Sequence, residues 1–410
     1  MTDTRSLIHP SWVAVLAGVC AALHVGKIPP ALPVLQAALS LSLVQAGFLL
    51  SMVQLAGMTL GLAVGLSVDS IGLRRSMLAG LGLLTLASAL GGFATGIEAL
   101  LVLRAVEGFG FLWVVMPAPA LIRRCVSAAQ LNTRMGQWSA YMPLGTATAL
   151  LVGAWVLSVW NWQVWWWLLS GVSALAWWMV WSGIAPDASY PAVQASGHEG
   201  WQRRLSHTLR SRGPWLLSLT FGVYAAQWLS VIGFLPTMYA GLGVDKGLSG
   251  LLTAGVALAN MTGNLASGRL LQRGWQSRRL LFIGFGAMAL GALGAFGEWQ
   301  GSGLPMAVRY VSVILLSAVG GLIPGTLFAL SMRLAPSPDT LSTTVGWMQQ
   351  WSATGQFFGP PAVAWVAASM GGWQWTWAVT GSCCVVGMGL AVAIDRALRV
   401  VAPRGGQGLS

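Results

Sequence analysis

Apolar runs recur along almost the whole chain, and they limit what it can fold into. Each run has roughly 20 residues or more, enough to cross ~30 Å of hydrocarbon as a helix. Hydrophobic residues make up 56% of the 410 residues and charged residues 8%, which is more apolar surface than a soluble chain of this length can bury. Backbone groups in lipid must also satisfy their own hydrogen bonds, so the runs predict helices. We therefore expect an all-α membrane protein with twelve spans, at about 11–35, 44–66, 76–95, 98–122, 135–159, 162–185, 214–240, 247–270, 279–298, 304–334, 340–367 and 372–398.

The basic residues are distributed unevenly along the chain. Of the 22 lysines and arginines, all but Lys27, Arg104, Lys246 and Arg309 fall in the termini or in alternate loops between the runs. Such loops stay on the cytoplasmic side by the positive-inside rule. We therefore expect a protein of the inner, or plasma, membrane with both termini in the cytoplasm. This placement accounts for the net charge of +12, so we expect no nucleic-acid partner.

The spans divide six and six, and the two halves repeat each other. Trp12 recurs 203 residues later as Trp215, and Gln137-Trp138-Ser139-Ala140 returns as Gln350-Trp351-Ser352-Ala353. Duplicated helical units of this kind are typical of secondary transporters, whose substrate site lies between the repeats near the bilayer midplane. We expect an N-terminal six-helix bundle, a cytoplasmic linker and a C-terminal six-helix bundle, at residues 1–185, 186–213 and 214–410.

A charged turn separates the second and third apolar runs. Its residues, Gly65-Leu66-Ser67-Val68-Asp69-Ser70-Ile71-Gly72-Leu73-Arg74-Arg75, combine glycines that permit close helix approach and a sharp reversal with arginines that hold the turn in the cytoplasm. The pattern Gly-x-x-x-Asp-x-x-Gly-x-Arg-Arg resembles the signature loop of the major facilitator superfamily. In that family the aspartate is thought to pair with basic residues and with the N-terminal end of helix 11. The resemblance therefore implies a conformational latch made of Gly65, Asp69, Gly72, Arg74 and Arg75.

Two further stretches carry the resemblance. Residues Arg104 to Gly110 are similar to the Arg-x-x-[Gln/Glu]-Gly-x-Gly pattern of helix 4 in the superfamily. Gly108 to Arg124, with the start of the fifth span, resembles the cyanate- and nitroimidazole-type members more weakly. The resemblance implies a monomer with twelve helices in two pseudo-symmetric bundles. It also implies that a small molecule crosses the bilayer by alternating access as the halves rock.

Four charged or titratable residues stand out inside the expected spans, two of them on the first. A charge there costs at least ~2.5–3.5 kcal/mol, so each needs a partner or a task. His24 and Lys27 lie one turn apart on one helix face. If that face looks into a cavity, Lys27 would attract an anionic substrate and the imidazole of His24 would exchange a proton. The structural alternatives are snorkelling of Lys27 to the lipid headgroups and a packing role for His24.

Arg104 and Glu107 also lie one turn apart, on the fourth span. They could neutralise each other, or Glu107 could pair with Lys27 on a neighbouring helix. A carboxylate in such a place can exchange a proton as the cavity opens to each side in turn. Proton coupling through Glu107 and a purely structural ion pair therefore both stay open. Arg104 keeps its proton and would help to attract an anion.

The second half offers amides and aromatic rings where the first half has charges, and Gln227 takes the place of His24 in the repeat. Amides would fix a small polar ligand by hydrogen bonds, and the duplicated tryptophans could line the cavity symmetrically. Simple bonding and packing between helices are the alternatives. The candidate ligand contacts of this kind are Gln137, Trp138, Tyr224, Gln227, Trp228, Asn260, Gln350 and Trp351.

These observations favour proton-coupled symport of a small organic or inorganic anion. Proton-driven efflux of drugs or of aromatic or lipophilic metabolites is the alternative, favoured by the 23 tryptophans and 16 methionines. No Gly-x-x-x-x-Gly-Lys-[Ser/Thr] loop occurs, which argues against ATP as the energy source. The carboxylates are scattered and the four cysteines show no metal-ligand spacing. We therefore expect no enzyme activity, no cofactor and no metal.

Overall fold

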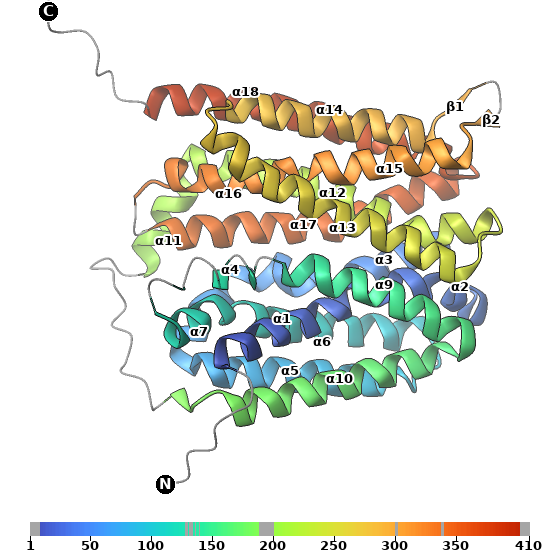
Figure 1. Cartoon of the computed structure of the whole chain (residues 1–410), viewed down its shortest axis with the longest axis horizontal. Helices are drawn as coiled ribbons and strands as arrows, with labels where there is room; N and C mark the ends of the chain where they lie inside the picture. The colour runs from blue at the N-terminus through green and yellow to red at the C-terminus, as the bar shows by residue number, and fades with distance from the viewer. Residues whose placement is uncertain are drawn as a thin grey trace, which may run out of the picture.

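Long helices, most of them running along one common direction, make up the molecule (Figure 1). The structure is a computed structural model that describes residues 9–127, 130, 134–135, 137–138, 140–187, 201–299, 302–337 and 340–401. Within those ranges, the side chains of 65–70, 201, 299 and 401 lie outside the description.

The helices of the first half lie together in the lower part of Figure 1, coloured blue to green. Several begin at recognisable caps: the Ser42 side chain accepts a hydrogen bond from the Gln45 amide, and Asn161 accepts one from the Val164 amide. The described elements are α1 (Pro10–Gly26), α2 (Ile28–Leu39), α3 (Leu43–Ser51), η1 (Met52–Gln54), α4 (Leu55–Ile71), α5 (Leu73–Gly91), α6 (Ile97–Val115), α7 (Ala118–Cys125), α9 (Tyr141–Val159) and α10 (Trp162–Gly183).

The helices of the second half lie above them, coloured yellow-green to red, with a short antiparallel hairpin at one end (Figure 1). The first of these helices, α11, falls inside the stretch expected to be a linker. The boundaries of that linker stay a prediction, because 188–200 lie outside the described residues. The elements are α11 (Trp201–Arg210), α12 (Arg212–Gly241), α13 (Lys246–Gln272), α14 (Ser277–Phe296), β1 (Glu298–Trp299), β2 (Ser302–Gly303), α15 (Met306–Gly320), α16 (Leu322–Leu334), α17 (Leu341–Ser369), η4 (Trp373–Trp375) and α18 (Thr376–Val401).

Each of the twelve expected spans coincides with one helix or with two or three consecutive helices. Among the described residues, ten such segments are long and apolar enough to cross a membrane by length and composition. The other two, α13 and α17, have 27 and 29 residues and are more polar, since α13 carries two asparagines and α17 three glutamines. Both lie where the two halves meet. The all-α fold with twelve spans is therefore the one that the hydropathy pattern predicts.

Several spans are interrupted midway, and the causes can be read from the sequence. The first span breaks at Lys27, which is followed by Pro29, Pro30 and Pro33. Each proline removes a backbone donor and disturbs the turn before it. The fourth span breaks similarly before Pro117, between α6 and α7. These breaks free backbone carbonyls in the middle of the molecule, where side chains can bind them.

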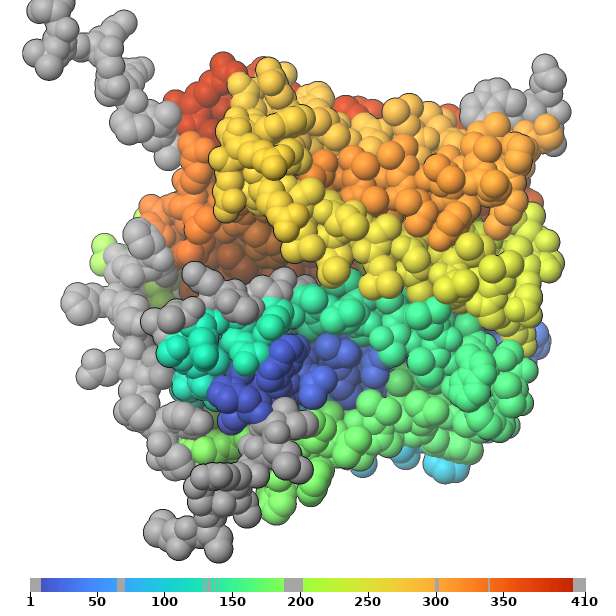
Figure 2. All heavy atoms as spheres, in the orientation of Figure 1, coloured from blue at the N-terminus to red at the C-terminus, as the bar shows by residue number. Residues whose placement is uncertain are grey.

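The two halves meet along a few helix pairs with close approaches. The pairs α9 and α13, α3 and α17, and α2 and α12 pack across the boundary. A Cβ added to Gly250 would lie 2.3 Å from the Cβ of Ala154, which shows how closely α13 approaches α9. At the end of the molecule that carries α11, Figure 2 shows the surface hollowed between α16 in orange and α7 in cyan. Helices α4 and α17 nevertheless stay in contact across the boundary, through Gln350 and the backbone of Met58 and Leu62.

Candidate functional site

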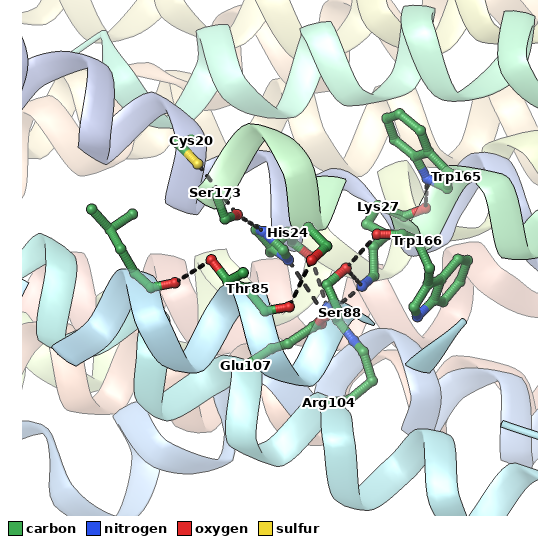
Figure 3. Close-up of polar contacts among 12 residues, drawn as sticks. Cys20, His24, Lys27, Thr85, Ser88, Arg104, Glu107, Trp165, Trp166 and Ser173 are labelled. Carbon is green, nitrogen blue, oxygen red and sulfur yellow. Dashed lines mark hydrogen bonds and ion pairs between the residues drawn. The ribbon is translucent and has the colours of Figure 1, made fainter. Parts of the chain in front are cut away.

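The break in the first span places Lys27 deep in the first half of the chain. Gly26 just before it allows α1 to approach α9 closely, because a Cβ there would lie 2.8 Å from the Cβ of Ala149. Lys27 has none of its side chain exposed, and neither has His24 one turn earlier. The two residues face α5, α6 and α10 of their own half, where both find their partners (Figure 3).

Glu107 of α6 is the centre of this group. Its carboxylate accepts hydrogen bonds from the Lys27 ammonium and from Arg104 Nη1, the latter at 2.6 Å. His24 Nδ1 lies 3.4 Å from the same carboxylate. The four side chains are each no more than 1% exposed. Glu107 therefore pairs with both cations that the sequence offered as alternatives, and we call His24, Lys27, Arg104 and Glu107 the charge cluster.

Neighbouring polar groups hold the charge cluster in place. His24 Nε2 lies 2.7 Å from Ser173 Oγ of α10, and Arg104 Nη1 donates to the His24 carbonyl at 2.7 Å. Lys27 Nζ donates to Ser88 Oγ of α5 at 3.1 Å. Ser173 and Ser88 were missed by the sequence analysis, since single serines in apolar runs resemble ordinary packing residues. The arrangement ties four helices of the first half together (Figure 3).

Two tryptophans of α10 complete the surroundings of Lys27. The ammonium lies 4.5 Å from the centre of the Trp166 ring, a cation–π distance. Trp165 Nε1 donates to the Lys27 carbonyl at 3.1 Å, next to the prolines that interrupt the helix. Tryptophans near the end of a span are commonly interfacial anchors, yet each of these rings is only 1% exposed. Their role in this structure is to enclose the charge cluster.

The charge cluster carries more positive than negative charge. In their usual ionic forms, Lys27 and Arg104 carry two positive charges together, whereas Glu107 carries one negative charge. Arg104 Nε and Nη2 are buried without a hydrogen-bond partner, and such a donor costs free energy when it is left unpaired. The cluster could therefore lose one positive charge, or gain one negative charge, without burying a net negative charge.

This placement differs from the expectation that the face carrying His24 and Lys27 looks into a cavity between the halves. In the conformation described, that face looks into the first half itself. The reason is that Glu107 and Arg104 lie on α6, and burial of charge is tolerated only where the partners meet. Contact of these residues with a substrate stays a prediction that requires the helices to move.

In the second half, Gln227 takes part in a contact that mirrors one in the charge cluster. Cys384 Sγ donates to Gln227 Oε1 at 3.1 Å. The repeat that relates Trp162-Gln163 to Trp373-Gln374 relates Ser173 to Cys384 in the same way. Because Gln227 takes the place of His24, the contact of Gln227 with Cys384 corresponds to that of His24 with Ser173. The repeat thus preserves the contact between first and last helices of each half while it replaces the charges by neutral groups.

Tyr224, Trp228 and Asn260 meet in a second polar network. Asn260 Nδ2 donates to Tyr224 Oη at 2.8 Å and to the Ser317 carbonyl at 2.9 Å. Trp228 Nε1 donates to Ser317 Oγ at 3.2 Å. The structure therefore brings together these three predicted residues, from α12 and α13, with one serine of α15. Their contact with a ligand stays a prediction.

The remaining predicted residues lie apart from both networks. Gln350 Nε2 donates to the Met58 carbonyl at 2.8 Å and so joins α17 to α4 across the two halves. Trp351 packs edge-to-face against Trp215 at 5.6 Å between ring centres. Gln137 and Trp138 lie before α9: Gln137 accepts a hydrogen bond from Arg134, and Trp138 stacks on Tyr141 at 4.3 Å. These contacts are structural in the conformation described, and ligand contact stays a prediction.

Comparison with known families explains this architecture. Residues 14–337 and 216–407 match the family described as Major Facilitator Superfamily. The chain belongs to the major facilitator superfamily. It is a secondary transporter of a small molecule and not an enzyme.

Solved structures support the fold of this major facilitator. A bacterial homolog of the human lysosomal transporter Spinster, inward-facing and occupied, superposes with a TM-score of 0.77 at 15% identity, covering 97% of this chain and 98% of that one. The D-xylose-proton symporter superposes with a TM-score of 0.72 at 16% identity, covering 93% and 96%. Identities this low establish the fold alone.

Two curated relatives match more locally. The cyanate transport protein CynX of Escherichia coli (strain K12) is 28% identical over 235 residues, 56% of this chain and 54% of that protein. The multidrug resistance protein Stp of Mycobacterium tuberculosis (strain CDC 1551 / Oshkosh) is 32% identical over 114 residues, 26% of this chain and 21% of that protein. The chain thus spans about half the length of one relative and about a fifth of the other.

The signature loop of this transporter is held by a residue that the sequence did not indicate. Asp187, which follows α10, accepts hydrogen bonds from the backbone amides of Arg74 and Arg75, both at 3.1 Å, at the start of α5. These amides lack partners within the helix. Gly72 has a φ of +104°, and a Cβ there would lie 2.4 Å from Asp187 Oδ2. The surroundings of Gly65 and the side chain of Asp69 are outside the part of the chain that the structure describes, so the latch with Asp69 stays a prediction.

Asp187→Ala is expected to loosen this turn. The substitution removes a carboxylate that caps the N-terminus of α5, a contribution of about 0.5–2 kcal/mol. Hydrogen exchange at the Arg74 and Arg75 amides should become faster by roughly a factor of two to thirty, since ~1.4 kcal/mol corresponds to a factor of ten. Asp187→Asn keeps one acceptor and should have a smaller effect. Unchanged exchange in Asp187→Ala would show that the cap does not hold the turn.

Proposed function

We propose that this transporter moves a small monovalent anion together with a proton, into the cell and through alternating access. The observation that carries the proposal is the surplus positive charge of the charge cluster, with two buried guanidinium nitrogens of Arg104 left unpartnered. An anion bound beside Arg104 and Lys27 would neutralise that surplus. We further propose that the protein is a monomer with both termini in the cytoplasm, as the distribution of arginines favours.

His24 and Glu107 are the proposed proton carriers. His24 lies between Ser173 Oγ and the Glu107 carboxylate, so the protonated ring would donate from Nδ1 to Glu107 and from Nε2 to Ser173. Protonation of either residue changes how strongly Glu107 holds Lys27 and Arg104, and it therefore changes their attraction for an anion. Because the group is buried in this conformation, a rearrangement of the helices must open it to one side at a time.

The match to a cyanate transport protein is consistent with this cargo, because cyanate is itself a small monovalent anion. That match covers about half of the chain, and the residues of the charge cluster support the proposal independently of it. A neutral or cationic substrate would leave the surplus on Lys27 and Arg104 uncompensated, and a divalent anion would exceed it.

Proton-driven efflux of drugs or lipophilic metabolites is the second candidate. A cavity of about 310 Å³ lies between α12, α17 and α18, and its lining is almost entirely apolar, with Trp351 and Phe358 among the residues. Such a lining suits an aromatic or lipophilic compound. The local match to a multidrug resistance protein favours the same reading.

Substrate-dependent pH change in proteoliposomes tests the two candidates against each other. Small anions such as cyanate, nitrite and formate are added outside, followed by lipophilic cations and neutral aromatics. Symport predicts that at least one of the anions makes the outside solution more alkaline, and that this pH change is lost in the Lys27→Ala variant. Protein-free liposomes control for weak acids that cross the bilayer unaided. Proton movement in the opposite sense, seen only with lipophilic compounds, would replace symport by efflux.

A further inference from the structure

A separate cavity of about 230 Å³ lies within the second half, at the end that carries the β1–β2 hairpin. Its walls come from α12, α14, α15 and the η4 turn, and they include the rings of Phe296, Tyr310 and Trp373. Every lining residue belongs to the second half, so this cavity is not the site between the halves at which a major facilitator transports its cargo. Neither the charge cluster nor the Asn260 network contributes to it.

Two buried hydrogen-bond donors that line this cavity have no partner. Tyr239 is 4% exposed, and its hydroxyl makes no hydrogen bond in the described structure. Arg309 Nε is likewise buried and unpartnered. A buried polar group without a partner is costly and uncommon. Arg309 Nε can only donate and the Tyr239 hydroxyl is able to donate, so an acceptor would satisfy both groups.

Gly303 of the hairpin lies directly against the Arg309 side chain. A Cβ added to Gly303 would lie 1.2 Å from Arg309 Nη2, so the guanidinium occupies the space that any other residue at 303 would need. Gly303 pairs with Glu298 across the hairpin. Glu298 also lines the cavity and is exposed, so it places a negative charge at the open side. Among the described residues, no ion pair joins Glu298 to Arg309.

We propose that this cavity binds a small monocarboxylic acid with an aromatic or branched apolar body. The carboxylate would accept hydrogen bonds from Arg309 and from the Tyr239 hydroxyl, and guanidinium groups recognise carboxylates particularly well. The apolar body would lie against Phe296, Tyr310 and Trp373. The cavity is smaller than the ~300–1,000 Å³ of drug-sized sites, which limits the ligand to about one ring. Glu298 disfavours a second negative charge.

Benzoate binding to the purified protein in lipid nanodiscs tests the proposal, measured by calorimetry or by saturation-transfer NMR. Benzyl alcohol lacks the carboxylate and terephthalate carries two, so both are expected to bind at least about tenfold more weakly than benzoate. Arg309→Gln should weaken benzoate binding about tenfold or more, and Tyr239→Phe about two- to tenfold, because they remove a charged and a neutral donor respectively.

Arg399→Gln is the matched control, because Arg399 is an exposed arginine remote from the cavity lining. Thermal unfolding shows whether each variant is folded, and Tyr239→Phe keeps the test decisive if Arg309→Gln is unstable. The proposal is overturned if benzoate does not bind, or if Tyr239→Phe and folded Arg309 variants bind it as the wild type does. Benzoate binding that is lost in Lys27→Met and kept in Arg309→Gln would assign the ligand to the charge cluster instead.

Discussion

Glu107→Gln is expected to abolish transport and to destabilise the protein. The substitution leaves Lys27 and Arg104 buried beside a neutral amide, although both donate to the Glu107 carboxylate in the wild type. Removing one partner of a buried ion pair typically costs ~3–5 kcal/mol, because the remaining charge is left uncompensated. Thermal unfolding in detergent or nanodiscs, with transport in proteoliposomes, measures both effects.

Glu98→Gln is the matched control for this prediction, because Glu98 lies in the first turn of the same helix and is exposed. It should leave stability and transport nearly unchanged. Adding Lys27→Met to Glu107→Gln removes one of the two stranded cations, so it should restore part of the lost stability but no transport. The central role of Glu107 is contradicted if Glu107→Gln unfolds and transports like the wild type.

Gly355→Val is expected to disrupt the packing of α17 against α12. A Cβ on Gly355 would lie 2.0 Å from the carbonyl oxygen of Gly222, which is backbone and cannot move aside. Valine adds a branched side chain at that point, and overpacking of this kind costs typically ~1–3 kcal/mol or more. The variant should fold in poor yield and unfold several degrees below the wild type.

Gly268→Val on α13 is the control, because a Cβ there meets nothing within 4 Å. Both substitutions place the same β-branched residue in a long helix. The difference between the unfolding temperatures of the two variants therefore isolates the effect of packing. Equal unfolding temperatures for the two variants would mean that α12 and α17 can separate without loss of stability.

The fold could be predicted from the sequence because its determinants are periodic and local. Runs of apolar residues give the spans, and the repetition of Trp12 as Trp215 gives the two halves. The break in the first span was not predicted, although the prolines after Lys27 are an equally local signal. None of these signals depends on which helices are neighbours in the fold.

The charge cluster could be predicted only in part. The spacing of Arg104 and Glu107 indicates an ion pair on one helix, and Lys27 was recognised as a possible partner from a neighbouring helix. The direction of that face could not be predicted, because it depends on how α1 packs against α5, α6 and α10. Ser173 and Asp187 were not predicted for the same reason, because each forms a hydrogen bond with a residue far away in the sequence.

Accumulation of the anion under an imposed pH gradient tests the central claim most directly. Proteoliposomes with an alkaline interior are compared with vesicles at equal pH, using the anion that moves protons in the screen. Proton symport predicts that the wild type concentrates the anion inside only when the gradient is present, and that Glu107→Gln does not. Uptake that merely equilibrates with or without the gradient, or accumulation that survives in Glu107→Gln, would contradict proton coupling through the charge cluster.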